Sequence, residues 1–167
     1  MGKICAFLGN SYDKFLNLKI GHNTPPNLKA RIREEVINLI EHEDVDTFLV
    51  GEIGGYEKDA YDVVLAVQRE YPKIQIYLVI SKMSDLHKTG FSEEDEVIRR
   101  WGFDDFIFPL KCEFGSKRLC IVYRNRYIIE NTDFIIAYNE YKGKAYNFCK
   151  AAKGNGVKVI ELAGNIA

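Results

Sequence analysis

The residues best suited to chemistry form a glycine-rich stretch, positions 51–57, with the sequence GEIGGYE. The stretch follows an apolar run and precedes a segment of helical periodicity, so we expect a turn between a strand and a helix. Glycines expose backbone N–H groups without a Cβ, and the first turn of a helix carries partial positive charge. These features predict an anion site, such as one for a phosphate. Its expected contact residues are Gly51, Glu52, Gly54, Gly55, Tyr56 and Glu57.

A second polar cluster lies in the C-terminal third, where Arg124 and Asn125 fall in a segment expected to be helical. A guanidinium binds a phosphate through two hydrogen bonds in a fixed geometry, which makes Arg124 the strongest phosphate-binding candidate. It could instead bond a carboxylate or carbonyl of the neighbouring sheet. Helical spacing predicts an apolar stripe and a polar stripe there, Leu119-Tyr123-Tyr127 and Lys117-Arg124-Asn131.

Six short apolar runs must position these residues, and longer segments of helical periodicity separate the runs. The runs cover residues 3–8, 47–50, 74–80, 105–108, 133–138 and 157–162. Continuous apolar runs are typical of strands covered on both faces. Helical stripes are formed by Leu28, Ile32, Val36, Leu39 and Ile40, by Ala60, Val63, Val64, Val67 and Tyr71, and by Ala145, Phe148, Cys149 and Ala152. The alternation predicts an α/β fold, a Rossmann-like three-layer sandwich with a mostly parallel sheet.

Composition favours one domain over residues 1–167. The chain has 167 residues, of which 47% are hydrophobic, enough for one sizeable core. It contains neither a membrane-length apolar run nor the apolar region of a signal peptide, so we expect a cytoplasmic protein without a membrane partner. The net charge of −1 argues against nucleic acid as a partner, although residues 111–167 carry 10 basic and 5 acidic residues. The four scattered cysteines indicate free thiols, with no metal and no cofactor.

Ligands of such sheets bind beyond the carboxyl ends of the strands. The further residues expected there are Gly9, Asn10, Tyr138, Gly143 and Lys144. These loops contain neither the GxGxxG nor the GxxxxGK[ST] pattern, which excludes a standard dinucleotide dehydrogenase and a P-loop NTPase.

Three blocks of sequence, taken together, resemble a known group of proteins. They are residues 5–9 (CAFLG), 51–57 (GEIGGYE), and 124–127 (RNRY) continuing through 133–138 (DFIIAY). In order and spacing they resemble the YpsA/YoqJ-type branch of the SLOG superfamily, which also contains the DprA and LOG Rossmann-like folds. The resemblance covers nearly the whole chain and implies a ligand related to nucleotides.

The resemblance also implies roles for particular residues. Gly9, Gly51 and Gly55 would allow close approach of the ligand, Glu57 would stand where the family usually has Asp, and Arg124 and Asn125 would belong to a ligand-facing helix. Where the family has a second glycine, this chain has Glu52, whose carboxylate would repel a phosphate by about 1 kcal/mol at contact in water. Lys142 or Lys144 could offset that repulsion.

Three functions follow as hypotheses. The leading one is a nucleotide or nucleotide-sugar binding module, for example for an ADP-ribose-like ligand, that acts as a sensor or regulator. The second is an enzyme that cleaves or transfers N-glycosidic bonds of nucleosides or nucleotides, for which Glu52, Glu57 and Glu140 are the candidate carboxylates. The third is an interaction protein, because aromatic residues make up 13% of the chain and those near loops could support a homodimer: Tyr12, Phe15, Tyr56, Tyr138 and Tyr141.

Overall fold

A computed structural model describes residues 2–9, 25–51, 56–79, 102–107 and 117–164 of the chain. Its strands are β1 (Lys3–Gly9), β2 (Val45–Val50), β3 (Gln75–Val79), β4 (Asp105–Ile107), β5 (Phe134–Tyr138) and β6 (Lys158–Glu161). Its helices are α1 (Leu28–His42), α2 (Tyr56–Glu70), α5 (Lys117–Asn131) and α6 (Lys144–Gly154). Every predicted apolar run overlaps one of these strands, so the strand predictions are confirmed.

The strands form one sheet in the order β4-β3-β2-β1-β5-β6, and each neighbouring pair is parallel. The chain moves outward from β1 to β4 on one side and then returns to β5 on the other side. The strand order therefore reverses between β1 and β5, as in doubly wound sheets. The predicted Rossmann-like α/β fold is confirmed.

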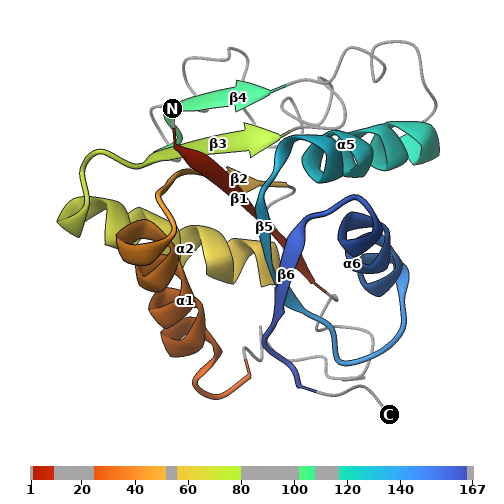
Figure 1. The fold of residues 1–167 in the computed structure, drawn as a ribbon, viewed down its shortest axis with the longest axis horizontal. Coiled ribbons are helices and arrows are strands. Elements are labelled where there is room, and N and C mark those ends of the chain that lie inside the picture. Colours follow the sequence, from red (N-terminus) through yellow and green to blue (C-terminus); the bar gives the residue numbers. More distant parts are fainter. Residues whose placement is uncertain (1, 10–24, 52–55, 80–101, 108–116, 165–167) are drawn as a thin grey trace.

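Two pairs of helices cover the two faces of this sheet (Figure 1): α1 and α2 lie on one face, and α5 and α6 on the other. The side chains of β1 alternate between the faces, because successive residues of a strand point in opposite directions. Cys5 and Phe7 belong to the cluster under α1 and α2, whereas Ala6 and Leu8 belong to the cluster under α5 and α6.

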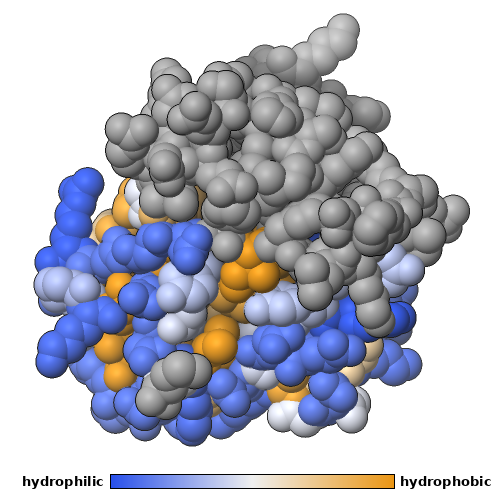
Figure 2. Space-filling view, turned by 90° about the horizontal axis from the view of Figure 1, so that it is seen from above, coloured by the Kyte–Doolittle hydropathy of each residue, from blue (hydrophilic) through white to orange (hydrophobic). Residues whose placement is uncertain are grey.

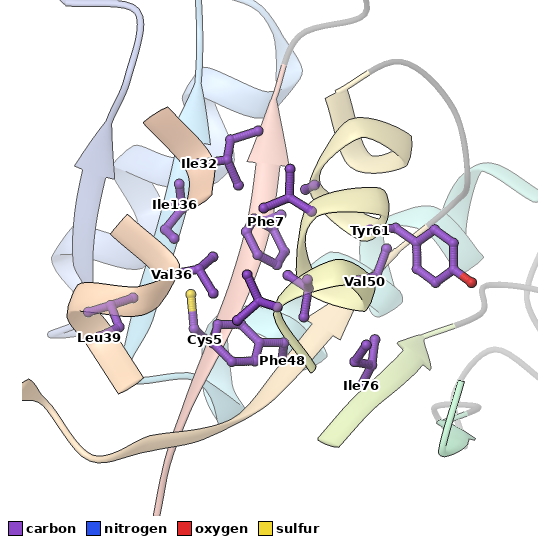
Figure 3. Close-up of a cluster of buried hydrophobic side chains, with 14 of the residues drawn as sticks. Cys5, Phe7, Ile32, Val36, Leu39, Phe48, Val50, Tyr61, Ile76 and Ile136 are labelled. Carbon is purple, nitrogen blue, oxygen red and sulfur yellow. The ribbon is translucent and has the colours of Figure 1, made fainter. Parts of the chain in front are cut away.

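The cluster under α1 and α2 is the larger apolar core (Figure 3). Phe7 and Phe48 stack in it with ring centroids 6.1 Å apart. Four residues of the predicted α1 stripe, Leu28, Ile32, Val36 and Leu39, are buried in this cluster, and the fifth, Ile40, is partly buried and packs against it. The smaller cluster on the opposite face consists of Ala6, Leu8, Leu49, Val79, Ile128, Ile129, Ile135, Ala137, Cys149, Ala152 and Val157.

The end of α6 is formed by two glycines. Gly154 is the final helical residue, and Asn155 is the cap. The left-handed residue is Gly156, with a φ of 86°, and its N–H donates to Lys153 O at 3.1 Å. The sequence KGNG offers two glycines, and only the second takes the backbone conformation that other residues rarely adopt.

Polar residues dominate one face of the described surface. On the face seen in Figure 2, the coloured part is mainly hydrophilic, with smaller hydrophobic areas between the polar residues. None of the helices in the described ranges is long and apolar enough to cross a bilayer.

Candidate functional site

The carboxyl edge of the sheet gathers the described site residues around the point where the strand order reverses. Gly9 ends β1 and is level with Tyr138, the last residue of β5. Gly51 directly follows β2, and α2 begins at Tyr56, so its positive N-terminal end lies at the same edge. Loops at this edge of a doubly wound sheet are where ligands bind.

Gly51 and Arg124 meet at this edge although 73 positions separate them. A Cβ added to Gly51 would lie 3.7 Å from Arg124 Cζ and 3.8 Å from its Nε. The guanidinium is buried, since Arg124 is 9% exposed. Its Nε and Nη2 donate to Asn125 Oδ1 at 3.3 and 3.2 Å. A Cβ at Gly51 would make only an ordinary contact with the guanidinium, and the Asn125 amide orients the group.

The buried face of α5 differs from the predicted stripe. Tyr123 and Tyr127 are only half-buried, while Arg124 and Asn125 face the sheet with Ile128, Ile129 and Thr132. The Thr132 hydroxyl donates to Ile128 O at 2.7 Å. Asn131, predicted to share a stripe with Arg124, is exposed. The apolar residues of α5 surround much of the helix, so periodicity alone selects no single face.

Tyr56 was expected to contact the ligand, but it is fully buried. Its hydroxyl donates to Ile136 O at 2.8 Å, and its ring lies 6.0 Å from that of Tyr138. A Cβ on Gly9 would be only 2.3 Å from Tyr56 Cδ1. In this structure Gly9 therefore makes room for a side chain of the protein. Neither tyrosine supplies the exposed aromatic surface expected for a homodimer.

Tyr138 bonds to one of the candidate carboxylates. Its hydroxyl donates to Glu140 Oε1, and Glu140 itself is exposed. Burial, followed by the hydrogen bond to Glu140, raises the pKa of the Tyr138 phenol, while the positive charge of Arg31 acts in the opposite direction. Glu57, a second candidate, is the second residue of α2 and is half-buried. Glu52, the third, lies outside the described residues.

The start of α6 also lies at the carboxyl edge. Gly143 precedes the helix in an extended conformation and gives it no side-chain cap. Lys144, the first helical residue, is exposed, and Lys142 Nζ lies 6.0 Å from the centre of the Tyr146 ring. The helix end and the two lysines make this part of the edge positive.

Sequence reasoning missed a polar pair, Asn139 and Glu161, directly after β5 and at the end of β6. The Asn139 N–H donates to Glu161 Oε1 at 2.8 Å, and its Nδ2 donates to Oε2 at 2.9 Å. Asn139 is 0% exposed. The sequence pattern that could have indicated this pair is a polar residue at the end of each of two neighbouring strands.

Cys149 of α6 packs against this pair. Asn139 Nδ2 lies 3.6 Å from its Sγ. Burial is the main cause that raises the pKa of the Cys149 thiol to about 11, partly opposed by that hydrogen bond. Burial also raises the pKa of Cys5 strongly. Both cysteines are free and buried, and neither is a thiolate nucleophile at neutral pH.

The remaining predicted contacts, Asn10, Gly54 and Gly55, lie outside the described residues, like Glu52. Within the described ranges, no three His, Cys, Asp or Glu side chains lie close enough together to hold a metal ion. No protein-family model matches the sequence, and a search of curated proteins found no match.

Proposed function

We propose that this protein binds a nucleotide or nucleotide-sugar at the carboxyl edge of the sheet, as a sensor or regulatory module of the SLOG type. The reversal of strand order between β1 and β5 supports this location, because it opens a crevice in which sheets of this class bind ligands. The positive ends of α2 and α6 favour an anionic ligand there. Buried free thiols agree with a reducing, cytoplasmic environment.

The buried guanidinium of Arg124 beside Gly51 is the observation that carries the proposal. The guanidinium lies on α5, buried beside the end of β2, where its positive charge favours an anion. Asn125 holds one side of the guanidinium, and the plane of the group is thereby set. A guanidinium fixed in this way is suited to bidentate recognition of a phosphate.

Isothermal titration of the full chain with ADP-ribose, cyclic nucleotides and common mononucleotides tests this function. We expect binding that Arg124→Lys weakens by about tenfold, because an ammonium loses the paired hydrogen bonds. Arg126→Gln is the matched control: Arg126 is exposed on the same helix, and its loss should change the affinity less than about twofold.

Two results would count against the proposal. One is the absence of any binding at millimolar ligand by a chain that unfolds cooperatively. The other is an equal loss of affinity in the Arg124 and Arg126 variants, which would mean that the ligand does not depend on the guanidinium of Arg124 in particular. The expected homodimer stays a separate prediction, which light scattering of the same samples checks.

A further inference from the structure

Three hydrogen bonds hold Asn139, at the carboxyl end of β5, in one orientation. Its Nδ2 donates to Glu161 Oε2 at 2.9 Å and to Cys149 Sγ at 3.6 Å, which uses both hydrogens of the amide. Its backbone N–H donates to Glu161 Oε1 at 2.8 Å. A rotation of the amide by half a turn would bring Oδ1 against the carboxylate. The carboxylate therefore decides which end of the amide faces β6.

The other end of this amide has no such neighbour. Asn139 Oδ1 is buried and lacks a hydrogen-bond partner among the described residues. A buried acceptor without a donor has lost its hydrogen bond to water and has not replaced it with another. Such groups are rare in native proteins. Oδ1 is therefore suited to accept a hydrogen bond from a molecule that enters the site.

The position of Oδ1 follows from the groups that hold Nδ2. Because Glu161 lies on β6 and Cys149 on α6, the opposite end of the amide faces away from both elements. The strand on the other side of β5 is β1, whose last residue, Gly9, is level with Tyr138, one residue before Asn139. Oδ1 thus faces the point where the strand order reverses.

This acceptor lies within one ligand's reach of the proposed phosphate site. Gly51 and Arg124 mark the end of β2, and β2, β1 and β5 are consecutive in the sheet. Neighbouring strands are about 4.8 Å apart, and Asn139 lies two residues beyond the level of Gly51, so the Cα atoms of Gly51 and Asn139 are separated by about 12 Å. A nucleotide, which carries phosphate and hydroxyl groups on one sugar, spans such a distance.

We infer that Asn139 Oδ1 accepts a hydrogen bond from a sugar hydroxyl of the bound nucleotide, and that Glu161 is the positioning residue that keeps this oxygen turned toward the ligand. The inference rests on the proposed function, in which Arg124 binds the phosphate. It adds the group that distinguishes a ribose from a deoxyribose.

Titrations of the full chain with AMP, 2′-deoxy-AMP, 3′-deoxy-AMP and adenosine test the inference. For the unsubstituted chain we expect one of the two deoxy analogues to bind at least about tenfold more weakly than AMP, because it leaves Oδ1 buried and unpaired. This comparison needs no substitution and so does not depend on the folding of a variant.

Glu161→Gln tests the positioning role. The new amide nitrogen beside Asn139 Nδ2 favours rotation of the Asn139 amide, which turns Oδ1 toward β6 and a donor toward the ligand. We expect the ratio of AMP to deoxy-AMP affinity to fall to within about twofold of unity. Glu130→Gln, at an exposed position of α5, is the control and should keep the full ratio.

Each outcome separates this inference from the function on which it rests. If AMP and both deoxy analogues bind equally well and adenosine binds more weakly, the inference is overturned and the phosphate site stands. If adenosine binds as tightly as AMP and a deoxy analogue binds more weakly, the inference is supported and the phosphate role of Arg124 is overturned. If none of the four binds at millimolar concentration, the inference is overturned, and the titrations with ADP-ribose and cyclic nucleotides decide the proposed function. An unchanged ratio in Glu161→Gln overturns the positioning role.

Discussion

Gly9 and Gly51 lie at the carboxyl ends of the neighbouring strands β1 and β2, but their Cβ positions face opposite sides of the sheet. The groups that they contact there differ in chemistry. The missing side chain of Gly9 is replaced by the buried ring of Tyr56, on the face covered by α1 and α2. The Cβ position of Gly51 faces the guanidinium of Arg124, on the face covered by α5, at an ordinary contact distance. The first glycine is required for packing, and the second lies beside a buried charge.

The same division extends through the two layers. The α1 and α2 side holds the larger apolar cluster, with stacked aromatic rings. The α5 and α6 side buries Arg124, Asn125 and Asn139 among smaller apolar residues. Because buried polar groups contribute less to stability than apolar ones of similar size, the first face mainly stabilises the fold. The second is suited to bind a ligand.

The largest expected effect is on the α1 and α2 face. Phe48 is fully buried against Phe7, so Phe48→Ala should lower the free energy of unfolding by about 3–5 kcal/mol. Tyr127→Ala, at a half-buried position of α5, is the comparison and should lower it by only about 1 kcal/mol. Urea unfolding measures both. Equal losses would mean that the two faces share the stabilising role.

A smaller effect on stability is expected when the two glycines are compared directly by substitution. Neither has a positive φ, so alanine at either position brings only its Cβ. Gly9→Ala forces that Cβ into the Tyr56 ring and should destabilise the protein by about 2–3 kcal/mol. Gly51→Ala makes only an ordinary contact with Arg124 and should change stability by less than about 1 kcal/mol. Thermal unfolding checks both variants, and a Gly51→Ala loss as large as that of Gly9→Ala would contradict the comparison.

The smallest effect concerns the thiol on the α6 side. Burial raises the pKa of Cys149 from 9.0 to about 11, so the native state keeps this proton to higher pH than the unfolded chain does. The stabilisation is complete below pH 9 and is lost as the pH rises through 11. Between pH 8 and 10 Cys149 should account for about 1 kcal/mol of lost stability.

Cys149→Ala isolates this contribution, because Tyr138 and Cys5, whose pKa values are also raised, remain in both proteins. Urea unfolding at pH 8 and pH 10 should show a smaller decrease for the variant than for the parent chain. An identical decrease would mean that the pKa of Cys149 does not differ between the native and unfolded states.

The apolar runs predicted the strands because a strand buried on both faces must be apolar throughout, and this requirement is visible in the sequence. The burial of a polar residue produces no comparable pattern in the sequence. Arg124 and Asn125 lie against the sheet because α5 is turned toward it through Ile128 and Ile129, which depends on contacts between distant segments. The sequence identified Arg124 as a candidate by its chemistry. It predicted a place on a polar stripe of the helix, whereas the residue is buried against the sheet.

Tyr56 shows a second limit of prediction from sequence, since a residue predicted to contact the ligand is part of the core. An aromatic residue after a glycine-rich turn is equally suited to a ligand site and to a core, and the sequence of the turn does not distinguish them. The choice is made by Gly9, in another strand, whose lack of a side chain opens the space that the ring fills. Asn139 was missed because its partner, Glu161, belongs to the neighbouring strand and lies 22 positions further along the chain.

The central place of β1 in the sheet has a consequence for synthesis. β1 pairs with β2 soon after both leave the ribosome, but its other edge waits for β5, as the bond between Ile4 N–H and Asp133 Oδ2 across 129 positions illustrates. Until then an apolar strand presents unpaired N–H and C=O groups, which favours aggregation. Closing so long a loop is also slow. The two edges of β1 are therefore covered at different stages of synthesis.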